Sequence, residues 1–186
     1  MIFESSLFYG MFNNLAIFIV MVFAYGLFIS AYPNSSTLRG RIVLGLCFGI
    51  IAFIAMHARI PASEGVIVDQ RNAITALSGA FGGPMAAAVT AVIAAGYRIY
   101  LGGSGVLSGV VGVCLGATAG VGMYYLRVPQ RGVVAIAVGA LVSTHIILTG
   151  FLVYIDVATG WALLKAVYLP FGTAIFLGIF LGSLLL

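Results

Sequence analysis

Charge is scarce in this chain, which has only eight Lys or Arg and four Asp or Glu among its 186 residues. Soluble domains carry about one quarter charged residues, whereas this chain is 63% hydrophobic and has a mean hydropathy of +1.23. A soluble protein is therefore excluded. The apolar runs reach about 20 residues, the length of a membrane-spanning helix, and lack the alternation of an outer-membrane barrel. The composition predicts an all-α polytopic membrane protein with one domain.

Cysteine is also scarce, and its two positions carry no chemical motif. Cys47 and Cys114 lie within apolar runs, without a CxxC pair and without a histidine at metal-ligand spacing. We expect two small hydrophobic side chains rather than a disulfide or a metal site. No basic run is present, so nucleic acid is not an expected partner. The first apolar run lacks a basic start and is too long for a cleaved signal peptide, so it is predicted as the first span.

Catalytic motifs are missing as well. The sequence has no nucleophile elbow, no paired carboxylates within one segment, no HExxH and no phosphate loop. The GGSG stretch at residues 102–105 is too short to hold a nucleotide. We therefore expect no enzyme activity and no cofactor in this domain.

Six apolar segments are predicted as helices, separated by loops rich in glycine, proline and polar residues. The segments are 7–31, 41–56, 72–101, 105–126, 132–155 and 162–186. The last segment ends without a polar stop. We therefore expect residues 1–186 to form a single transmembrane domain that is cut from a longer protein.

Arginines in two loops indicate how these segments cross the membrane. Arg39 and Arg41 lie in the first loop, and Arg127 and Arg131 lie in the loop after the fourth segment. The positive-inside rule places both pairs in the cytoplasm, which requires the third segment to return to the side from which it came. We therefore predict five full spans plus a re-entrant third element, with the N-terminus outside and the C-terminus inside.

A Gly-Gly-Pro sequence gives this return a physical cause. Pro84 lacks an N–H and clashes with the preceding turn, while Gly82 and Gly83 tolerate dihedral angles that other residues avoid. In transporters, broken helices of this kind lie beside a binding site. The alternative is a kinked third helix that crosses fully, because residues 84–101 extend about 27 Å and nearly span the bilayer alone.

If the third element folds back, Arg71 and Arg98 approach each other on one side of the membrane. An arginine in the bundle interior costs about 2.5–3.5 kcal/mol on insertion scales and needs a partner. Asp69, Glu64 or an anionic ligand would serve, since a guanidinium group binds a carboxylate through two hydrogen bonds. The alternative for Arg98 is an interfacial side chain that snorkels between two neighbouring tyrosines.

Other polar and small residues join this candidate anion site. Asn72 and Thr75 lie in the first turn of the short helix, whose N-terminus also presents free N–H groups to an anion. Ser108 lies near the outer end of the fourth segment, which also contains Gly109 and Gly112. Gly105 and Gly109 are four residues apart, as are Gly112, Gly116 and Gly120, a spacing that favours close helix packing. A glycine-lined wall beside a ligand is the alternative.

The remaining polar residues of the apolar segments have simpler expected roles. His145 lies mid-span and is predicted either as a functional group or as a structural histidine satisfied by a neighbouring hydroxyl. Asn13 and Asn14 are expected to form hydrogen bonds between helices. Asp156 and Lys165 flank the fifth loop and are expected to be surface charges.

The run at residues 65–105, GVIVDQRNAITALSGAFGGPMAAAVTAVIAAGYRIYLGGSG, resembles the signature of the five-transmembrane LytS-YhcK sensor family, 5TMR-LYT. The shared pattern is an arginine before an apolar stretch, a Gly-Pro break, and then an arginine and Gly-Gly. The detailed similarity covers about residues 65–120, and the hydropathy layout agrees over nearly the whole chain. The GVIVDQR form is more similar to members fused to diguanylate cyclases than to the histidine-kinase members.

This resemblance implies an inner-membrane input domain of a bacterial signalling protein, which works as a homodimer and precedes a cytoplasmic diguanylate cyclase or kinase. It also implies a distant similarity to the S-components of energy-coupling-factor vitamin transporters. Some kinase members are taken to sense small carboxylates such as pyruvate, and that role carries over to Arg71 and Arg98. The polar Cys and Ser of those members correspond here to Gly109 and Gly112, which leaves room for a bulkier ligand.

Three functions follow from these observations. The first is a sensor for a small carboxylate-like anion that enters from the periplasmic side. In this function Arg71 and Arg98 bind the charge, while Asp69, Asn72 and Ser108 set the orientation of the ligand. The second is a transport subunit similar to an S-component. The third is a membrane anchor and dimerisation domain, in which the two arginines form internal ion pairs.

Overall fold

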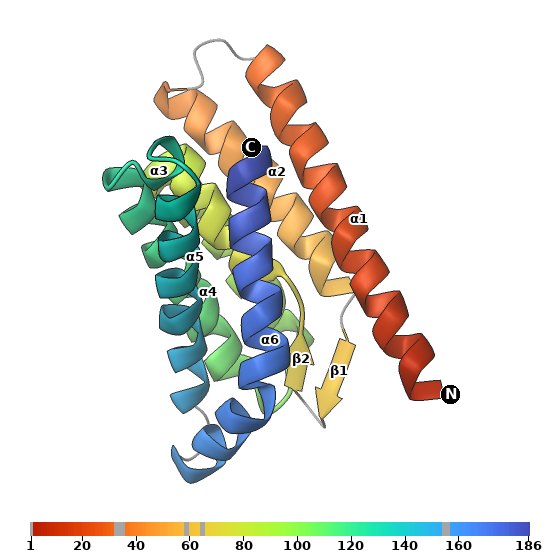
Figure 1. Ribbon diagram of the computed structural model, residues 1–186. Coiled ribbons are helices and arrows are strands. Elements are labelled where there is room, and N and C mark those ends of the chain that lie inside the picture. Colours follow the sequence, from red (N-terminus) through yellow and green to blue (C-terminus); the bar gives the residue numbers. More distant parts are fainter. Residues whose placement is uncertain (1, 32–35, 58–59, 64–65, 154–156) are drawn as a thin grey trace.

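The computed structural model describes residues 2–31, 36–57, 60–63, 66–153 and 157–186 (Figure 1). Within these residues the fold consists of long helices with one short antiparallel strand pair. The elements are α1 (Ile2–Ala31), α2 (Leu38–His57), β1 (Ile60–Ser63), β2 (Val66–Val68), α3 (Arg71–Leu101), α4 (Val106–Tyr125), η1 (Val128–Gln130), α5 (Val133–Leu148), η2 (Thr149–Leu152) and α6 (Val157–Leu185).

The predicted all-α membrane class and the six predicted helices are confirmed, with helix ends shifted by a few residues. Four stretches of the described chain are long and apolar enough to cross a membrane. These are Leu38–His57, Arg71–Leu101, Val106–Tyr125 and Val133–Leu152. The loop predicted between the second and third segments was wrong in part, because it contains β1 and β2, paired through Ile60 with Val68 and Pro61 with Ile67. Glu64 and Asp156 lie outside the described residues, as do the side chains of Asn13 and Asn14.

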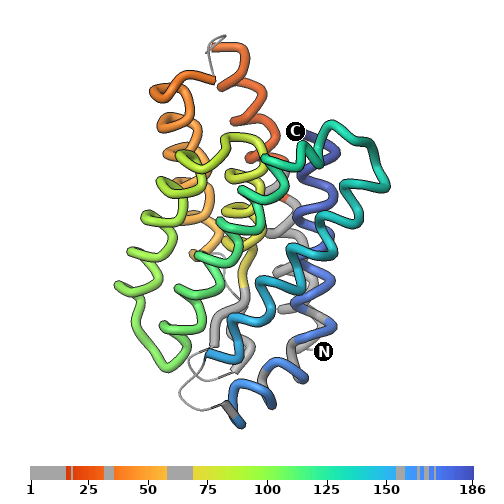
Figure 2. The backbone as a smooth tube through the Cα atoms, turned by 90° about the vertical axis from the view of Figure 1, so that its left-hand side faces the viewer, coloured from red at the N-terminus to blue at the C-terminus, as the bar shows by residue number. Residues whose placement is uncertain are grey.

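A break at Gly83 divides α3 into residues 71–82 (arm 1) and residues 84–101 (arm 2). Gly83 has φ 72° and ψ −166°, a conformation that essentially only glycine adopts. Pro84 then begins arm 2. At this first position of a helix the backbone N–H has no partner within the helix, so the missing N–H of proline costs no hydrogen bond. Figure 2 shows the two arms lying side by side. The predicted break at Gly82, Gly83 and Pro84 is confirmed, and the chain does not form the alternative third helix that continues in one direction.

Two buried hydroxyl groups hold the arms together. Ser78 Oγ of arm 1 lies 2.7 Å from Thr90 Oγ1 of arm 2. Thr90 Oγ1 donates in turn to the carbonyl oxygen of Gly45 in α2, at 3.0 Å. Because Thr90 uses its proton on Gly45, Ser78 is the donor to Thr90. This chain of hydrogen bonds joins arm 1, arm 2 and α2.

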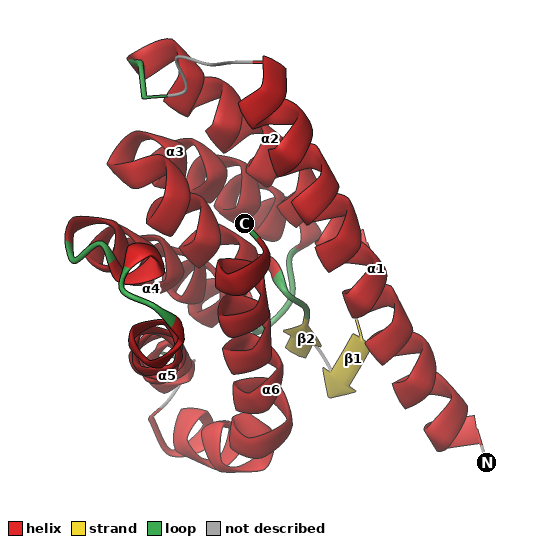
Figure 3. Cartoon of the chain, turned by 45° about the horizontal axis from the view of Figure 1, so that its top comes forward, coloured by secondary structure: helices red, strands yellow, loops and turns green. Residues whose placement is uncertain are grey.

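Arm 1 lies at the centre of the molecule, and residues 71–80 are all buried. Its Ile74 and Leu77 belong to an apolar cluster with α1 and α2, whereas Ala73 and Ala76 belong to a second cluster with α4, α5 and α6. Figure 3 shows α3 between α2 and α4. Both halves of the core therefore depend on the folded-back helix.

The two pairs of arginines predicted in loops lie at the same end of the molecule, although Arg39 and Arg41 belong to the first turn of α2. Arg41 Nη2 donates to Tyr124 Oη at 2.9 Å, and its guanidinium group lies 5.5 Å from the centre of the Tyr124 ring. Tyr124 also packs on the turn of α3, because a Cβ on Gly83 would lie 3.2 Å from its ring. We call the end of the molecule that carries Arg39, Arg41, Arg127 and Arg131 the basic end. Figure 2 places the C-terminus at this end too. This arrangement is the one that a returning third element requires.

Candidate functional site

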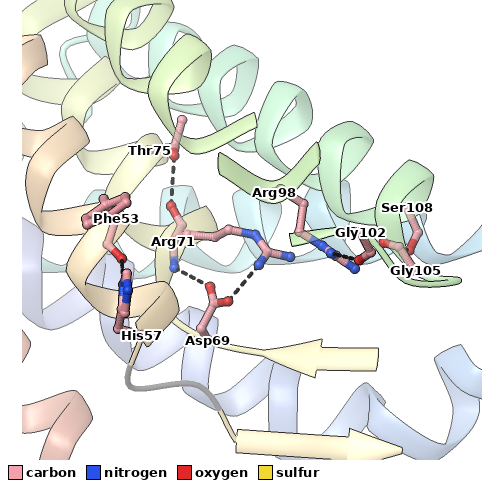
Figure 4. A network of polar contacts seen from close by, with 9 residues as sticks. All are labelled: Phe53, His57, Asp69, Arg71, Thr75, Arg98, Gly102, Gly105 and Ser108. Carbon is pink, nitrogen blue, oxygen red and sulfur yellow. Dashed lines mark hydrogen bonds and ion pairs between the residues drawn. The ribbon is translucent and has the colours of Figure 1, made fainter. Parts of the chain in front are cut away.

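The first arm of α3 begins with a buried ion pair. Asp69 precedes the helix, and its Oδ1 accepts the backbone N–H of Arg71 at 3.0 Å. Its Oδ2 accepts Nη1 of the same arginine at 2.6 Å (Figure 4). Both side chains are at least 95% buried. Asp69 therefore both satisfies a free N–H group of the helix start and orients the Arg71 guanidinium.

The second arm of α3 ends beside Arg98, the largest fully buried side chain in the described chain. Only 1% of Arg98 is exposed, so it is not the snorkelling interfacial arginine of the alternative prediction. Its Nη1 donates to the carbonyl oxygen of Gly102 at 2.6 Å. Gly102 has φ 68°, a left-handed conformation that suits glycine, and this turns its carbonyl back toward the arginine (Figure 4).

The two arginines meet at Gly109 of α4, although they are 27 positions apart in the sequence. A Cβ on Gly109 would lie 2.7 Å from Arg98 Nε and 3.1 Å from Arg71 Nη2. The space that a side chain would occupy at this position is therefore taken by the two guanidinium groups. This is the approach predicted for a chain that folds back at Gly-Gly-Pro.

A small cavity lies beside the two guanidinium groups. It has a volume of about 20 Å³, which is room for about one water molecule. A larger ligand therefore requires the walls to move. The lining residues come from α3, α4, α5, η2 and α6, and they are Arg71, Asn72, Arg98, Gly105, Ser108, Gly109, Gly112, Ile147, Gly150, Phe151 and Phe171.

Two of the predicted site residues do not line the cavity. The carboxylate of Asp69 binds Arg71. The hydroxyl of Thr75 donates a hydrogen bond to the carbonyl oxygen of Arg71, one turn earlier in the helix, at 2.8 Å. Both residues therefore support Arg71 rather than face the cavity. Ser108 does line it, with Oγ donating to the Gly105 carbonyl oxygen at 3.2 Å. Because this hydrogen bond uses only the hydroxyl proton, the Ser108 oxygen can still accept a hydrogen bond from an occupant of the cavity.

Arg71 and Asn72, which line the cavity, each have a buried polar atom with no hydrogen-bond partner among the described residues. These atoms are Arg71 Nε, a donor, and Asn72 Oδ1, an acceptor. Buried polar atoms are nearly always paired with protein or with water, and each exception requires an explanation. A cavity wall that moves to admit a ligand can therefore present a further donor and a further acceptor to it.

The glycines of α4 fall into two groups, one at the cavity and one against the backbone of arm 1. Gly112 lines the cavity, and a Cβ there would lie 3.2 Å from Asn72 Nδ2. Further along α4, a Cβ on Gly116 would lie 2.8 Å from the Asn72 carbonyl oxygen, and one on Gly120 would overlap the Ala76 carbonyl oxygen. The outer glycines therefore make room at the site, and the inner ones let α4 approach the backbone of arm 1.

The comparison with known families agrees with this architecture. The family model described as 5TMR of 5TMR-LYT matches residues 25–186, which is most of the chain. The chain belongs to the 5TMR-LYT family. This is a family of transmembrane sensor domains, so the protein contains a membrane sensing domain. No curated protein and no solved structure matches the chain.

The cavity of this 5TMR-LYT domain contacts α6, the last helix. Phe171 of α6 lines the cavity and packs edge-on against Phe151 of η2, with ring centres 5.6 Å apart. Next to the ion pair, Gln70 Nε2 donates to the carbonyl oxygen of Ala174 in α6 at 3.3 Å. No sequence motif marks Phe151, Phe171 or Ala174, and only tertiary packing brings them to the site.

The other polar positions of the 5TMR-LYT domain lie away from the cavity. His145 is exposed, and its ring nitrogens lie 2.8 Å from the Leu141 carbonyl oxygen and 2.8 Å from Tyr168 Oη. Its side-chain partner is therefore a tyrosine of α6 rather than the neighbouring hydroxyl that the sequence suggested. Cys47 and Cys114 are free thiols. Lys165 is exposed, with its Nζ 5.4 Å from the centre of the Trp161 ring.

Proposed function

We propose that this domain is the ligand-sensing input of a bacterial signalling protein, and that its ligand is a small carboxylate-like anion bound between Arg71 and Arg98. The observation that carries this proposal is the meeting of two buried guanidinium groups at one cavity, from opposite ends of a helix that folds back. Guanidinium groups bind carboxylates through charge-assisted hydrogen bonds, which are strong in a buried site.

The unpartnered atoms narrow the chemistry of this ligand. A carboxylate oxygen would accept the free N–H of Arg71 Nε, whereas Asn72 Oδ1 needs a donor. A carboxylate with a neighbouring hydroxyl or amino group supplies both, and Ser108 can accept from the same group. We therefore favour a hydroxy acid or an amino acid over an anion that has acceptors only.

The position of the cavity supports entry from the periplasmic side. Arm 2 runs about 22 Å from its turn at the basic end to Arg98, so the cavity lies toward the opposite end of the molecule. The positive-inside rule assigns the basic end to the cytoplasm. On this assignment the N-terminus is periplasmic, the C-terminus is cytoplasmic, and the membrane is the bacterial inner membrane.

Helix α6 is the proposed route of the signal. It contributes Phe171 to the cavity wall, accepts a hydrogen bond from Gln70, and ends at the basic end. Because the cavity holds only about one water molecule, a ligand has to displace Phe171 or its neighbours. A ligand that binds the displaced state more tightly shifts the population of α6 positions. We propose a homodimer with a diguanylate cyclase as the output module beyond α6.

The test is a thermal-unfolding screen of the purified domain against hydroxy acids, amino acids, simple carboxylates and inorganic phosphate. A ligand at 100 times its Kd adds about 2.7 kcal/mol to the stability of the folded state. We expect the shift to disappear in Arg98→Lys and Arg71→Lys, which keep the charge but lose the planar fork. Arg39→Lys is the matched control, because Arg39 is exposed and lies at the basic end.

Other outcomes would point to other functions. The membrane-anchor function rests on the Asp69–Arg71 ion pair, and it predicts that no compound shifts the melting temperature while Arg98→Lys still melts early. The transport function, suggested by the likeness to S-components, predicts uptake of a radiolabelled hit into vesicles that contain the domain. Binding without uptake, lost in both lysine variants, is the result that the sensing function requires.

A further inference from the structure

A second concave region lies on the outer surface, between α4 and α5 and away from the arginine cavity. It is an elongated groove of about 870 Å³, a volume within the range of small-molecule sites. Val134 and Val138 form part of its rim and are 78% and 55% exposed. Gly122 leaves open space between the two helices, since a Cβ there would meet nothing within 4 Å, whereas a Cβ on Gly139 would lie 2.8 Å from Val128.

The polar groups within the groove are already satisfied by the protein. Thr118 Oγ1 donates to the Leu115 carbonyl oxygen at 3.0 Å, and Ser143 Oγ donates to Met123 Sδ at 3.4 Å. The remaining described lining is apolar apart from Arg131, whose exposed side chain lies where η1 joins α5. The groove therefore has apolar walls and a positive charge at one end.

Charge around Arg131 is unbalanced. The basic end carries Arg39, Arg41, Arg127 and Arg131, which are half of the Lys and Arg residues in the sequence. The four acidic residues of the chain are Glu4, Glu64, Asp69 and Asp156, and none lies within residues 36–41 or 126–132. Neutralisation at this end therefore requires anions from outside the chain.

We propose that the α4–α5 groove binds one anionic phospholipid, with an acyl chain between the two helices and the headgroup phosphate on Arg131. The apolar walls match a hydrocarbon chain, and a guanidinium group matches a phosphate through two parallel hydrogen bonds. Basic pockets between transmembrane helices bind anionic lipid headgroups on the cytoplasmic side. This proposal does not depend on the ligand of the arginine cavity.

A second copy of the chain fits this groove less well. Copies in one membrane share the same orientation, so a two-fold contact along the groove would bring equivalent ends of the two copies together. Arg131 and Arg127 of each copy would then lie at the same level of the contact, where like charges repel. A lipid phosphate supplies the opposite charge at the same position.

The experiment measures lipid binding to the full 186-residue chain, delipidated in detergent, by native mass spectrometry. The probes are phosphatidylglycerol, which is anionic, and phosphatidylcholine, which is zwitterionic. Arg131→Gln removes the headgroup contact. Gly122→Leu fills the groove, since a Cβ at this position meets nothing within 4 Å. Arg39→Gln and Gly26→Leu are matched controls, because Arg39 is exposed on α2 and Gly26 also has open space around it.

We expect saturable binding of one phosphatidylglycerol per chain and weaker binding of phosphatidylcholine. Arg131→Gln should raise the Kd about fivefold, the factor expected for one basic charge beside an anionic lipid. Gly122→Leu should abolish the one-to-one complex at an unchanged melting temperature, while both controls bind as the original chain does. Equal losses in Arg39→Gln and Arg131→Gln, retained binding in Gly122→Leu, or equal binding of the two lipids would each overturn the proposal. A changed dimer fraction in lipid-free Gly122→Leu would instead identify a contact between copies.

Discussion

The candidate site requires that residue 109 have no side chain. Arg71 and Arg98 both extend into the space beside this residue, and the cavity next to them has only about 20 Å³. Neither guanidinium group can retreat easily, because Asp69 orients one and the Gly102 carbonyl oxygen binds the other. The geometry of the whole site therefore responds to the smallest change at one position.

Gly109→Ala should displace both guanidinium groups. Its Cβ would lie 2.7 Å from Arg98 Nε, closer than real contacts of this kind, and overpacking of a buried site costs about 1–3 kcal/mol. We expect a lower melting temperature and at least a tenfold weaker affinity for any anion found in the screen. Gly96→Ala is the matched control, because a Cβ there meets nothing within 4 Å. Unchanged affinity in Gly109→Ala would show that the ligand does not bind between the arginines.

Asp69→Asn tests the buried ion pair. The change keeps an acceptor for the Arg71 N–H but removes the negative charge, which leaves a buried guanidinium group uncompensated. Breaking a buried pair in this way costs about 3–5 kcal/mol. We expect Asp69→Asn to lower the free energy of unfolding by this amount in a denaturant titration, and the double variant Asp69→Asn/Arg71→Gln to recover part of it. Strictly additive losses would show that the two charges are not coupled.

At the scale of elements, the turn of α3 determines where the site can form. Arm 1 and arm 2 are joined directly at Gly83, and Ser78 and Thr90 hold them side by side. Tyr124 of α4 packs on the turn and binds Arg41 of α2, so three helices meet at this point. The meeting of Arg71 and Arg98 is the consequence of this turn at the other end of the arms.

Gly83→Ala should destabilise the domain by about 1–3 kcal/mol, the cost of a side chain in a backbone conformation that is essentially restricted to glycine. The new Cβ would also lie 3.2 Å from the Tyr124 ring. Pro84→Ala is the comparison, because it leaves Gly83 in place and removes only the proline ring. We expect thermal unfolding to show a large loss for Gly83→Ala and a small one for Pro84→Ala. The reverse order would assign the turn to the proline.

Much of this element was predictable. Hydropathy located the six helices, and Gly82, Gly83 and Pro84 marked the break, because glycine and proline affect the backbone wherever they occur. The strand pair Ile60–Ser63 and Val66–Val68 was not predicted, since strands of three and four residues have too little pattern to distinguish them from a loop. Phe151 and Phe171 were also missed at the site, because only tertiary packing brings them to Arg71.

At the scale of the whole molecule, one helix connects the site with the end of the chain. Helix α6 contributes Phe171 to the cavity wall, and its Ala174 carbonyl oxygen accepts a hydrogen bond from Gln70, next to the Asp69–Arg71 ion pair. The helix then continues to the basic end. The same helix belongs to the apolar cluster that contains Ala73 and Ala76 of arm 1. A displacement of α6 therefore cannot occur without a change in its contacts with arm 1.

Gln70→Leu should separate binding from its effect on α6. Gln70 does not line the cavity, so the affinity for the anion should stay within about twofold, whereas the hydrogen bond to Ala174 is lost. A spin label at the exposed Leu185, in a chain with both cysteines replaced, would report movement of the helix end. We expect the ligand-induced spectral change to decrease in Gln70→Leu and to persist in the exposed control Gln130→Leu. An unchanged response would exclude Gln70 from the coupling.

Arm 1 also has a consequence for the biogenesis of the protein. Its 12 residues extend about 18 Å, less than the roughly 20 residues that a spanning helix needs, and it begins with an ion pair. A segment of this kind does not partition into lipid alone. Its partners include Gly112, Gly116 and Gly120 of α4, which the ribosome makes later. Arm 1, at the centre of the molecule, therefore reaches its final packing only after α4 has been made. The helices cannot assemble in the membrane strictly in the order of translation.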